Sequence, residues 1–238
     1  MALVPWTYNN PRTTNSRDVV RQFVFGGHLI EVLQDFSEEI DVTKNTERKL
    51  WDGAFLLARY LENTGVFPAG FWNGRHCIEL GAGCGLTGLV AWLLGANVTL
   101  TDLPSATEHT KCCVNSNVDR LGQTNPSLAH RATAILVNDY TWGGKQDLQH
   151  LSPPYDFIFG SDIVYSAKSS DSLVEALQSL CGPCSLVLLS YKPRGLHEDV
   201  FFTKLVNSRF TISCVPREFH PTDFANSEYD IYRITRCK

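Results

Sequence analysis

The sequence predicts an α/β fold: a seven-stranded sheet with helices on both faces, preceded by an N-terminal β-hairpin. Three observations predict this fold. Between residues 75 and 102, a strand, a glycine-rich turn, a helix and a second strand follow one another, which is one βαβ unit. Strand and helix patterns go on alternating to about residue 207. Two further strand patterns close the chain, near enough in sequence to pair as an antiparallel edge.

The individual elements follow from hydropathy periodicity and from turn residues. Residues 1–20 are polar and are expected to form an N-terminal arm. Residues 23–33 alternate on both sides of Gly26-Gly27, as a β-hairpin does. Apolar residues at helical spacing predict helices over 50–61, 86–94, 105–118, 172–180 and 199–207. Short apolar runs predict the seven sheet strands over 75–80, 97–102, 132–138, 155–160, 186–190, 210–215 and 229–235.

Composition and charge limit the kind of protein. The chain has 238 residues, 43% hydrophobic and 19% charged, which fits one globular domain over 21–238. The net charge of −4 gives no electrostatic reason to expect nucleic acid or an anionic membrane as partner. No apolar run reaches about 18 residues. The N-terminus has no signal-peptide pattern, so we expect a cytoplasmic protein; the sequence leaves the oligomeric state open.

A glycine-rich loop follows the first strand of the βαβ unit. It runs Glu79-Leu80-Gly81-Ala82-Gly83-Cys84-Gly85, and its glycines let the backbone turn tightly and approach a ligand closely. Asp102 ends the next strand, where a carboxylate can bind both hydroxyls of a ribose. The unit therefore predicts a site for a nucleotide-type cofactor.

The position of Glu79 distinguishes two classes of cofactor. Gly83, Gly85 and Gly88 allow a loose match to the Gly-x-Gly-x-x-Gly loop of dinucleotide sites. Glu79 would, however, place a carboxylate close to a pyrophosphate, and like charges repel. S-adenosyl-L-methionine carries an ammonium and a sulfonium instead, so the loop favours a methyl donor. An NAD-dependent oxidoreductase and a glycine-rich connector without a ligand are the alternatives.

A second candidate position follows the fourth strand. Ligands of open α/β sheets bind outside the carboxyl ends of the strands, near the switch between the first and fourth. Asp162 and Tyr165 come directly after this strand, so we expect them over the reactive end of the cofactor. The alternative for Asp162 is a helix cap or a turn.

Eight cysteines include one Cys-x-x-Cys pair, Cys181-Gly182-Pro183-Cys184. A thioredoxin-type pair opens a helix after a strand, whereas this one ends a helical pattern and precedes a strand. We therefore expect free thiols rather than redox chemistry. A second ligand pair at zinc spacing is absent from the sequence, and no metal is expected.

At these residues the chain resembles a known family, the seven-β-strand protein-lysine methyltransferases of methyltransferase family 16, and in particular the methyltransferase-like 21 group. The Asp-x-x-Tyr of Asp162 and Tyr165 is the most specific mark. The match covers about nine-tenths of the chain, in order. Its segments are 23–35, 50–54, 79–85, 101–104, 140–143, 161–165 and 230–232.

The resemblance implies a Rossmann-like class I methyltransferase sheet and S-adenosyl-L-methionine as cofactor. For the two tryptophans in the implied site, the alternative is plain core packing. The implied cofactor-binding residues are Trp51 near the methionine moiety, Glu79 supporting the loop, Gly81, Ala82 and Gly83 through backbone, Asp102 at the ribose, Trp142 stacked on adenine, and Ser161 beneath the cofactor.

The resemblance also implies the acceptor, a lysine side chain of a protein substrate, and relatives act on chaperones and translation elongation factors. Asp162 would capture and aim this lysine, and Tyr165 would line its channel. Three residues depart from the family pattern without removing a required group: Cys84, Tyr140 and Ser161. The alternatives are a small-molecule methyltransferase of the same fold and a cofactor-binding protein without catalysis.

Overall fold

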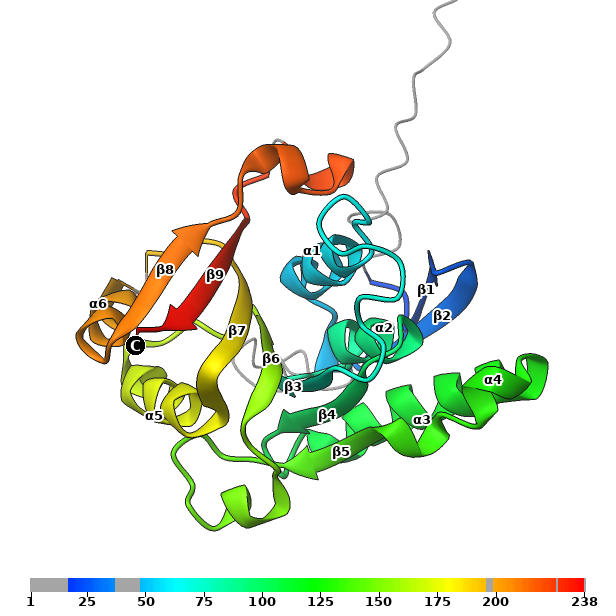
Figure 1. Ribbon diagram of the computed structural model, residues 1–238. Coiled ribbons are helices and arrows are strands. Elements are labelled where there is room, and N and C mark those ends of the chain that lie inside the picture. Colours follow the sequence, from blue (N-terminus) through cyan, green and yellow to red (C-terminus); the bar gives the residue numbers. More distant parts are fainter. Residues whose placement is uncertain (1–16, 37–47, 196–198, 226, 238) are drawn as a thin grey trace, which may run out of the picture.

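The computed structural model describes residues 17–36, 48–195, 199–225 and 227–237 (Figure 1). Within them lies the predicted seven-stranded sheet, in which neighbouring strands are parallel from β5 to β7. β9 is antiparallel to both β7 and β8, so the predicted antiparallel edge is confirmed. In spatial order the strands are β5 (Ile135–Asp139), β4 (Asn97–Asp102), β3 (His76–Leu80), β6 (Tyr155–Ser161), β7 (Cys181–Tyr191), β9 (Asp230–Arg236) and β8 (Phe210–Cys214).

The N-terminal hairpin is also confirmed. β1 (Val20–Phe25) and β2 (His28–Leu33) pair antiparallel around Gly26 and Gly27, whose φ angles are 54° and 77°. Positive φ at both residues of a two-residue turn matches the right-handed twist of the strands and strongly favours glycine. Residues 1–16 of the expected arm lie outside the described residues, and β1 begins at Val20.

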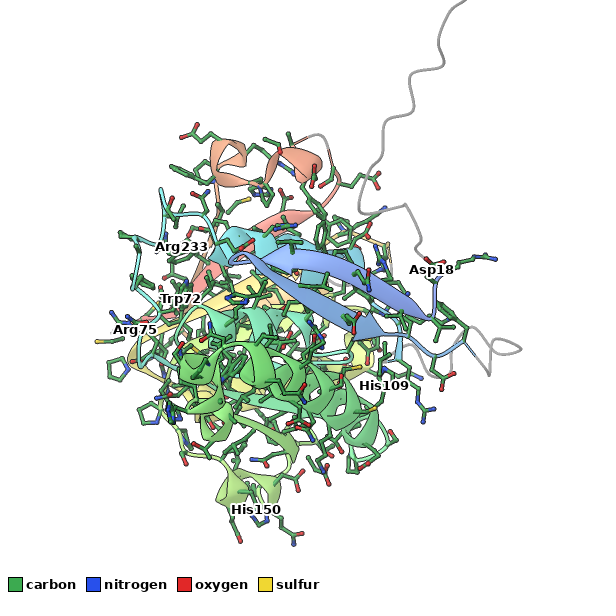
Figure 2. All side chains as sticks on the ribbon, turned by 90° about the vertical axis from the view of Figure 1, so that its right-hand side faces the viewer. Asp18, Trp72, Arg75, His109, His150 and Arg233 are labelled. Carbon is green, nitrogen blue, oxygen red and sulfur yellow. The ribbon has the colours of Figure 1, made fainter. Side chains whose placement is uncertain are left out.

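Helices cover the sheet in two layers, each with its own apolar core. α1 (Asp52–Leu61), α2 (Leu86–Leu93) and α3 (Thr107–Thr124) share one core with the hairpin, and the short α4 (Pro126–Ala129) extends this layer. α5 (Ser170–Leu180) and α6 (Asp199–Asn207) share the other. Figure 1 shows these two helices on the opposite side of the sheet from α1 and α2. Figure 2, turned toward the hairpin, shows it lying across the first layer.

Several predicted boundaries are wrong by a few residues. β7 begins at Cys181 rather than 186, because Cys181 already pairs with Tyr155; the register then shifts, and regular pairing with β6 runs on from Phe157 opposite Leu186. The Gly-Pro dipeptide in this stretch hides the alternation of a strand. The helix predicted to end near 118 continues to Thr124, and residues 132–134 form a 3₁₀ turn ahead of β5.

The topology brings the two candidate positions to one edge of the sheet. β3 and β6 are neighbours, with Leu80 opposite Gly160, so the glycine-rich loop and Asp162 leave the same edge side by side. In the described part of the chain, no helix has both the length and the apolar character needed to span a membrane.

Candidate functional site

The glycine-rich loop after β3 has the tight backbone that the sequence predicts. Gly81, Gly83 and Gly85 have φ angles of 60°, 53° and 75°, a region that L side chains rarely adopt. The Ala82 amide donates to the Thr101 carbonyl on β4 (3.0 Å), and the Thr110 hydroxyl on α3 donates to the Gly83 carbonyl (2.6 Å). The loop is thus tied to the next strand and to the next helix.

Gly81 also leaves space for a close neighbour. A Cβ built there would lie 2.8 Å from Ile163 Cγ2 and 3.5 Å from Trp142 Cζ2. Trp142, from the loop after β5, is therefore brought beside the glycine-rich loop, where the resemblance places adenine. Ile163, the residue after Asp162, reaches the same glycine, so the two candidate positions are in direct van der Waals range.

Asp102 ends β4 beneath this loop. Its Oδ2 accepts the Gly83 amide (2.8 Å) and its Oδ1 accepts the Leu103 amide (2.7 Å), which fixes the orientation of the buried carboxylate. A carboxylate oxygen can accept more than one hydrogen bond, so these two contacts do not by themselves prevent the carboxylate from binding hydroxyl groups. The arrangement fits two ribose hydroxyls.

Glu79 is fully buried at the carboxyl end of β3. Its Oε2 accepts the Gly88 amide in the first turn of α2 (2.8 Å), while Oε1 has no hydrogen-bond partner among the described residues. Burial raises the pKa of this carboxyl to about 8, although hydrogen bonds from the Gly88 amide and the Thr87 hydroxyl act to lower it. With this pKa the carboxyl is mostly protonated at neutral pH when no cofactor is bound, and a cofactor with positive charge would favour its ionised form.

Asp162 begins the acceptor side of the site. It follows β6 with a φ of 57°, and only 7% of its surface is exposed. Oδ2 accepts the Gly53 amide (2.9 Å) and the Tyr229 hydroxyl (3.1 Å), and Oδ1 accepts Nη2 of Arg194 (2.5 Å). Burial raises the pKa of Asp162, and these three donors oppose the rise, Arg194 most strongly.

The start of α1 is fixed against the same carboxylate. A Cβ at Gly53 would lie 2.4 Å from Asp162 Oδ2 and 2.9 Å from Ser190 Oγ on β7. The Ser190 hydroxyl donates to the Gly53 carbonyl (2.8 Å), and the Asp162 amide donates to the Ser190 carbonyl (3.0 Å). Trp51 precedes α1 and is 42% exposed, and the Arg194 guanidinium lies 5.6 Å from its ring centroid.

The other predicted residues lie at the ends of these elements. Ser161 is buried as the last residue of β6, opposite Ser190. Tyr165 is 52% exposed, and the phenol hydrogen-bonded to Asp162 belongs to Tyr229 instead. Sequence reasoning missed Arg194 and Tyr229 as site residues. Arg194 could have been found as a cation just past the carboxyl end of β7, the edge where ligands bind.

The Cys-x-x-Cys pair lies at the amino end of β7, away from this edge. α5 ends at Leu180 and β7 begins at Cys181, so the pair does not open a helix. Cys181 is buried, Cys184 is exposed, and both are free thiols. No cluster of three or more His, Cys, Asp or Glu side chains able to hold a metal occurs among the described residues.

Comparison with known proteins decides the family. A family model described as lysine methyltransferase matches residues 33–208. The chain belongs to the lysine methyltransferase family. A protein N-lysine methyltransferase METTL21A of Danio rerio is 34% identical over 239 residues, covering 100% of this chain and 98% of the relative. An EEF1A lysine methyltransferase 3 of Mus musculus is 33% identical over 207 residues, covering 86% and 80%.

Solved methyltransferase structures share the fold of this lysine methyltransferase. SMU.776, a putative methyltransferase complexed with SAH, aligns with a TM-score of 0.57 at 16% identity, covering 92% of this chain and 56% of its own. A TehB-like SAM-dependent methyltransferase of Corynebacterium glutamicum aligns with a TM-score of 0.53 at 14% identity, covering 76% and 86%. At such identities these structures show the fold alone. The predicted fold, enzyme class and methyl donor, S-adenosylmethionine, are those of the family.

Proposed function

We propose that this lysine methyltransferase holds its acceptor lysine at Asp162, and that the acceptor belongs to a chaperone or translation elongation factor of the cytoplasm. The observation that carries the proposal is the buried Asp162 carboxylate one strand away from the glycine-rich loop. Ile163, directly after it, packs toward Gly81 of that loop. The short separation between this carboxylate and the methyl-donor loop supports an amine-binding role for Asp162.

On the cofactor side, the contacts support the roles that the resemblance implies. Asp102 would hold the ribose, and Trp142 would stack on adenine beside Gly81. The implied set is completed by Ala82 and Gly83 through backbone, Glu79 beneath the loop, Trp51 at the methionine end and Ser161 below the cofactor.

S-adenosylmethionine supplies an electrophilic methyl group on a sulfonium, and the chain must present a neutral amine in line with it. Free lysine has a pKa of about 10.4 and is mostly ammonium at pH 7. Asp162 orients the amine by accepting an N–H, Tyr165 lines the approach, and the amine proton leaves to water. Alignment of the reacting groups supplies most of the rate.

The name of a relative supports the substrate class, and the charge of the chain bears on two other classes of partner. A relative at 33% identity is named EEF1A lysine methyltransferase 3, so it is named for a protein acceptor. The family resemblance implies translation elongation factors as one class of acceptor. The net charge of −4 gives no electrostatic attraction to nucleic acid or to an anionic membrane, which we propose are not partners.

Labelled methyl transfer tests the proposal. Purified enzyme, tritiated S-adenosylmethionine and a cytoplasmic lysate are incubated, and label is read on a gel and located by mass spectrometry. We expect one or a few protein bands carrying methyl-lysine, and no label on free lysine or small amines. Label on small amines only would favour the small-molecule enzyme, and cofactor binding with no label on any acceptor would favour the non-catalytic alternative.

Asp162→Asn, with Asp156→Asn as matched control, tests the site. Asp156 lies at the other end of β6 and accepts the His76 amide (2.9 Å), which asparagine also can do. We expect label to fall at least about 100-fold for Asp162→Asn, as for a group that acts mainly in the transition state, and to stay at wild-type level for the control. Wild-type turnover of Asp162→Asn would place the lysine elsewhere.

A further inference from the structure

The Asp162 carboxylate forms an ion pair with Arg194, a residue to which the proposed chemistry assigns no role. Arg194, in the segment after β7, pairs with Oδ1, and the side chains of the two residues are 23% and 4% exposed. In the described part of the chain, two neutral donors also reach the carboxylate: the Gly53 amide from α1 and the Tyr229 hydroxyl just ahead of β9. Asp52, in the first turn of α1, is a further charged group whose field reaches this cluster, at Tyr229.

A lone carboxylate would work against methyl transfer. An opposite charge within about 4–6 Å stabilises the protonated form of an amine, and a protonated amine has no lone pair with which to attack the methyl group. A neutral acceptor in place of Asp162 would avoid this penalty, but it would bind the lysine less strongly. The site therefore needs a carboxylate whose charge is balanced.

We propose that Arg194 balances the charge of Asp162, so that the site binds the acceptor lysine as the free amine rather than as the ammonium ion. This inference rests on the proposed function of Asp162. The guanidinium and the carboxylate together carry no net charge. Asp162 Oδ1, which accepts one hydrogen bond from Arg194, can accept a second one from an N–H of the amine, while the lysine proton goes to water before the methyl group is transferred. Arg194 is thus a positioning residue that acts through Asp162.

Trp51 gives the guanidinium a defined place. Arg194 lies 5.6 Å from the centroid of its indole, within the range of a cation–π contact. A planar guanidinium can stack on an indole and pair with a carboxylate at once, which an ammonium does less well. The exposed Trp51 ring therefore belongs to the acceptor side as much as to the cofactor side.

The test is the pH dependence of methylation, because a merely structural role of Arg194 would not move it. Initial rates of tritium transfer to the lysate proteins are measured from pH 6.5 to 10 for wild type, Arg194→Gln and Arg194→Lys. Arg120→Gln is the matched control, an arginine on α3 paired with Glu31 (3.6 Å) far from this edge. Calorimetry with S-adenosylmethionine checks that each variant is folded.

For Arg194→Gln we expect the midpoint of the rise in rate to move up by about one pH unit. The rate would then be about tenfold below wild type at pH 7.5 and would recover most of this loss by pH 9.5. Arg194→Lys retains the positive charge, so its midpoint is expected near that of wild type, as is the midpoint of Arg120→Gln.

An Arg194→Gln enzyme with the wild-type midpoint, however slow, would overturn the inference. If that variant does not fold, a midpoint shift in Arg194→Lys as large as one pH unit would overturn it as well, since the charge is present there. Failure of the proposed function looks different: Asp162→Asn would then turn over at the wild-type rate, whatever the Arg194 variants do.

Discussion

The centre of the cofactor side, the glycine-rich loop and Asp102, comes from one βαβ unit, whereas Asp162 on the acceptor side has partners from distant segments of the chain. Asp102 binds the Gly83 amide 19 residues away, within one βαβ unit. Asp162 binds groups 109, 32 and 67 residues away, from α1, the segment after β7 and the residue ahead of β9. One side depends on local backbone geometry, and the other exists only when the whole sheet is in place.

The two sides also treat a buried carboxylate differently. Glu79 receives one backbone amide and no cation among the described residues, and burial raises its pKa to about 8. Asp162 receives a guanidinium as well as neutral donors, and these oppose the effect of burial on its pKa. On the cofactor side, the positive charge beside Glu79 would come from the methyl donor. On the acceptor side, the positive charge beside Asp162 is the guanidinium of Arg194.

The largest effect is expected for a substitution that disturbs only the acceptor side, Gly53→Ala. In Gly53→Ala the new Cβ would lie 2.4 Å from Asp162 Oδ2, so the carboxylate must move. Displacement of a catalytic group by about 1 Å costs on the order of 100-fold in turnover. We expect that loss in labelled methyl transfer, with S-adenosylmethionine affinity by calorimetry within a few-fold of wild type.

Gly122→Ala in α3 is the control. A Cβ there would lie 3.4 Å from Ala129 of α4, an ordinary van der Waals distance. It should retain full activity. If Gly53→Ala instead lost cofactor affinity and turnover in parallel, the two sides would not be separable as described.

The next effect concerns the stability of the cofactor side. The folded pKa of Glu79, about 8, lies above its ordinary value of 4.5. Between these values the folded protein holds a proton that the unfolded chain has released, so stability falls as pH rises through this window. From pH 5.5 to 8 this group should lower the free energy of unfolding by about 2–3 kcal/mol. Glu79→Gln removes the titration, so its stability should depend less steeply on pH.

Urea denaturation of wild type and Glu79→Gln without cofactor, at pH 5.5 and at pH 8, measures this difference. Equal slopes for the two proteins would show that Glu79 does not hold the proton in the folded state. The expected sign is specific: the free energy of unfolding of Glu79→Gln, relative to that of wild type, increases as the pH rises.

A somewhat smaller effect is expected for the ribose carboxylate. Asp102→Ala removes the acceptor of the Gly83 amide and the proposed partner of the ribose hydroxyls. Loss of hydrogen bonds to a charged group should weaken the binding of S-adenosylmethionine by about 1.5–3 kcal/mol. Calorimetry checks this, with Asp162→Asn expected to bind the cofactor within a few-fold of wild type. Tight binding of NAD by the wild-type protein would contradict the cofactor assignment itself.

The contrast explains which parts of the site could be predicted from the sequence. The loop and Asp102 follow from one βαβ unit, whose geometry depends on short-range glycine and strand patterns. Asp162 was accessible too, since the sheet-edge rule needs only the order of the strands. Boundaries were least certain at β7, where Gly182 and Pro183 interrupt the alternation of the strand.

The same rule would bring Arg194 to this edge, but the pairing of Asp162 with Arg194 and with Tyr229 could not be predicted in this way. Arg194 stands in Lys192-Pro193-Arg194, which has the pattern of a solvated basic cluster. The place of Tyr229 depends on β9 entering antiparallel between β7 and β8, so that the start of β9 meets the carboxyl end of β7. Tyr165 was predicted from a motif, and its role stays a prediction.

The smallest effect is expected for a pair of residues outside both sides, Cys181 and Cys184. They lie at the amino end of β7, opposite the edge that carries the site. Burial raises the pKa of the Cys181 thiol to about 12, so it has almost no reactive thiolate at neutral pH. Changing both to serine should therefore leave methyl transfer within about twofold of wild type, with or without reductant. Exposed Cys184→Ser alone serves as the control for the buried change. A folded double variant that loses more than about tenfold in turnover, or a wild-type enzyme that needs reductant for activity, would show that redox chemistry at β7 reaches the site.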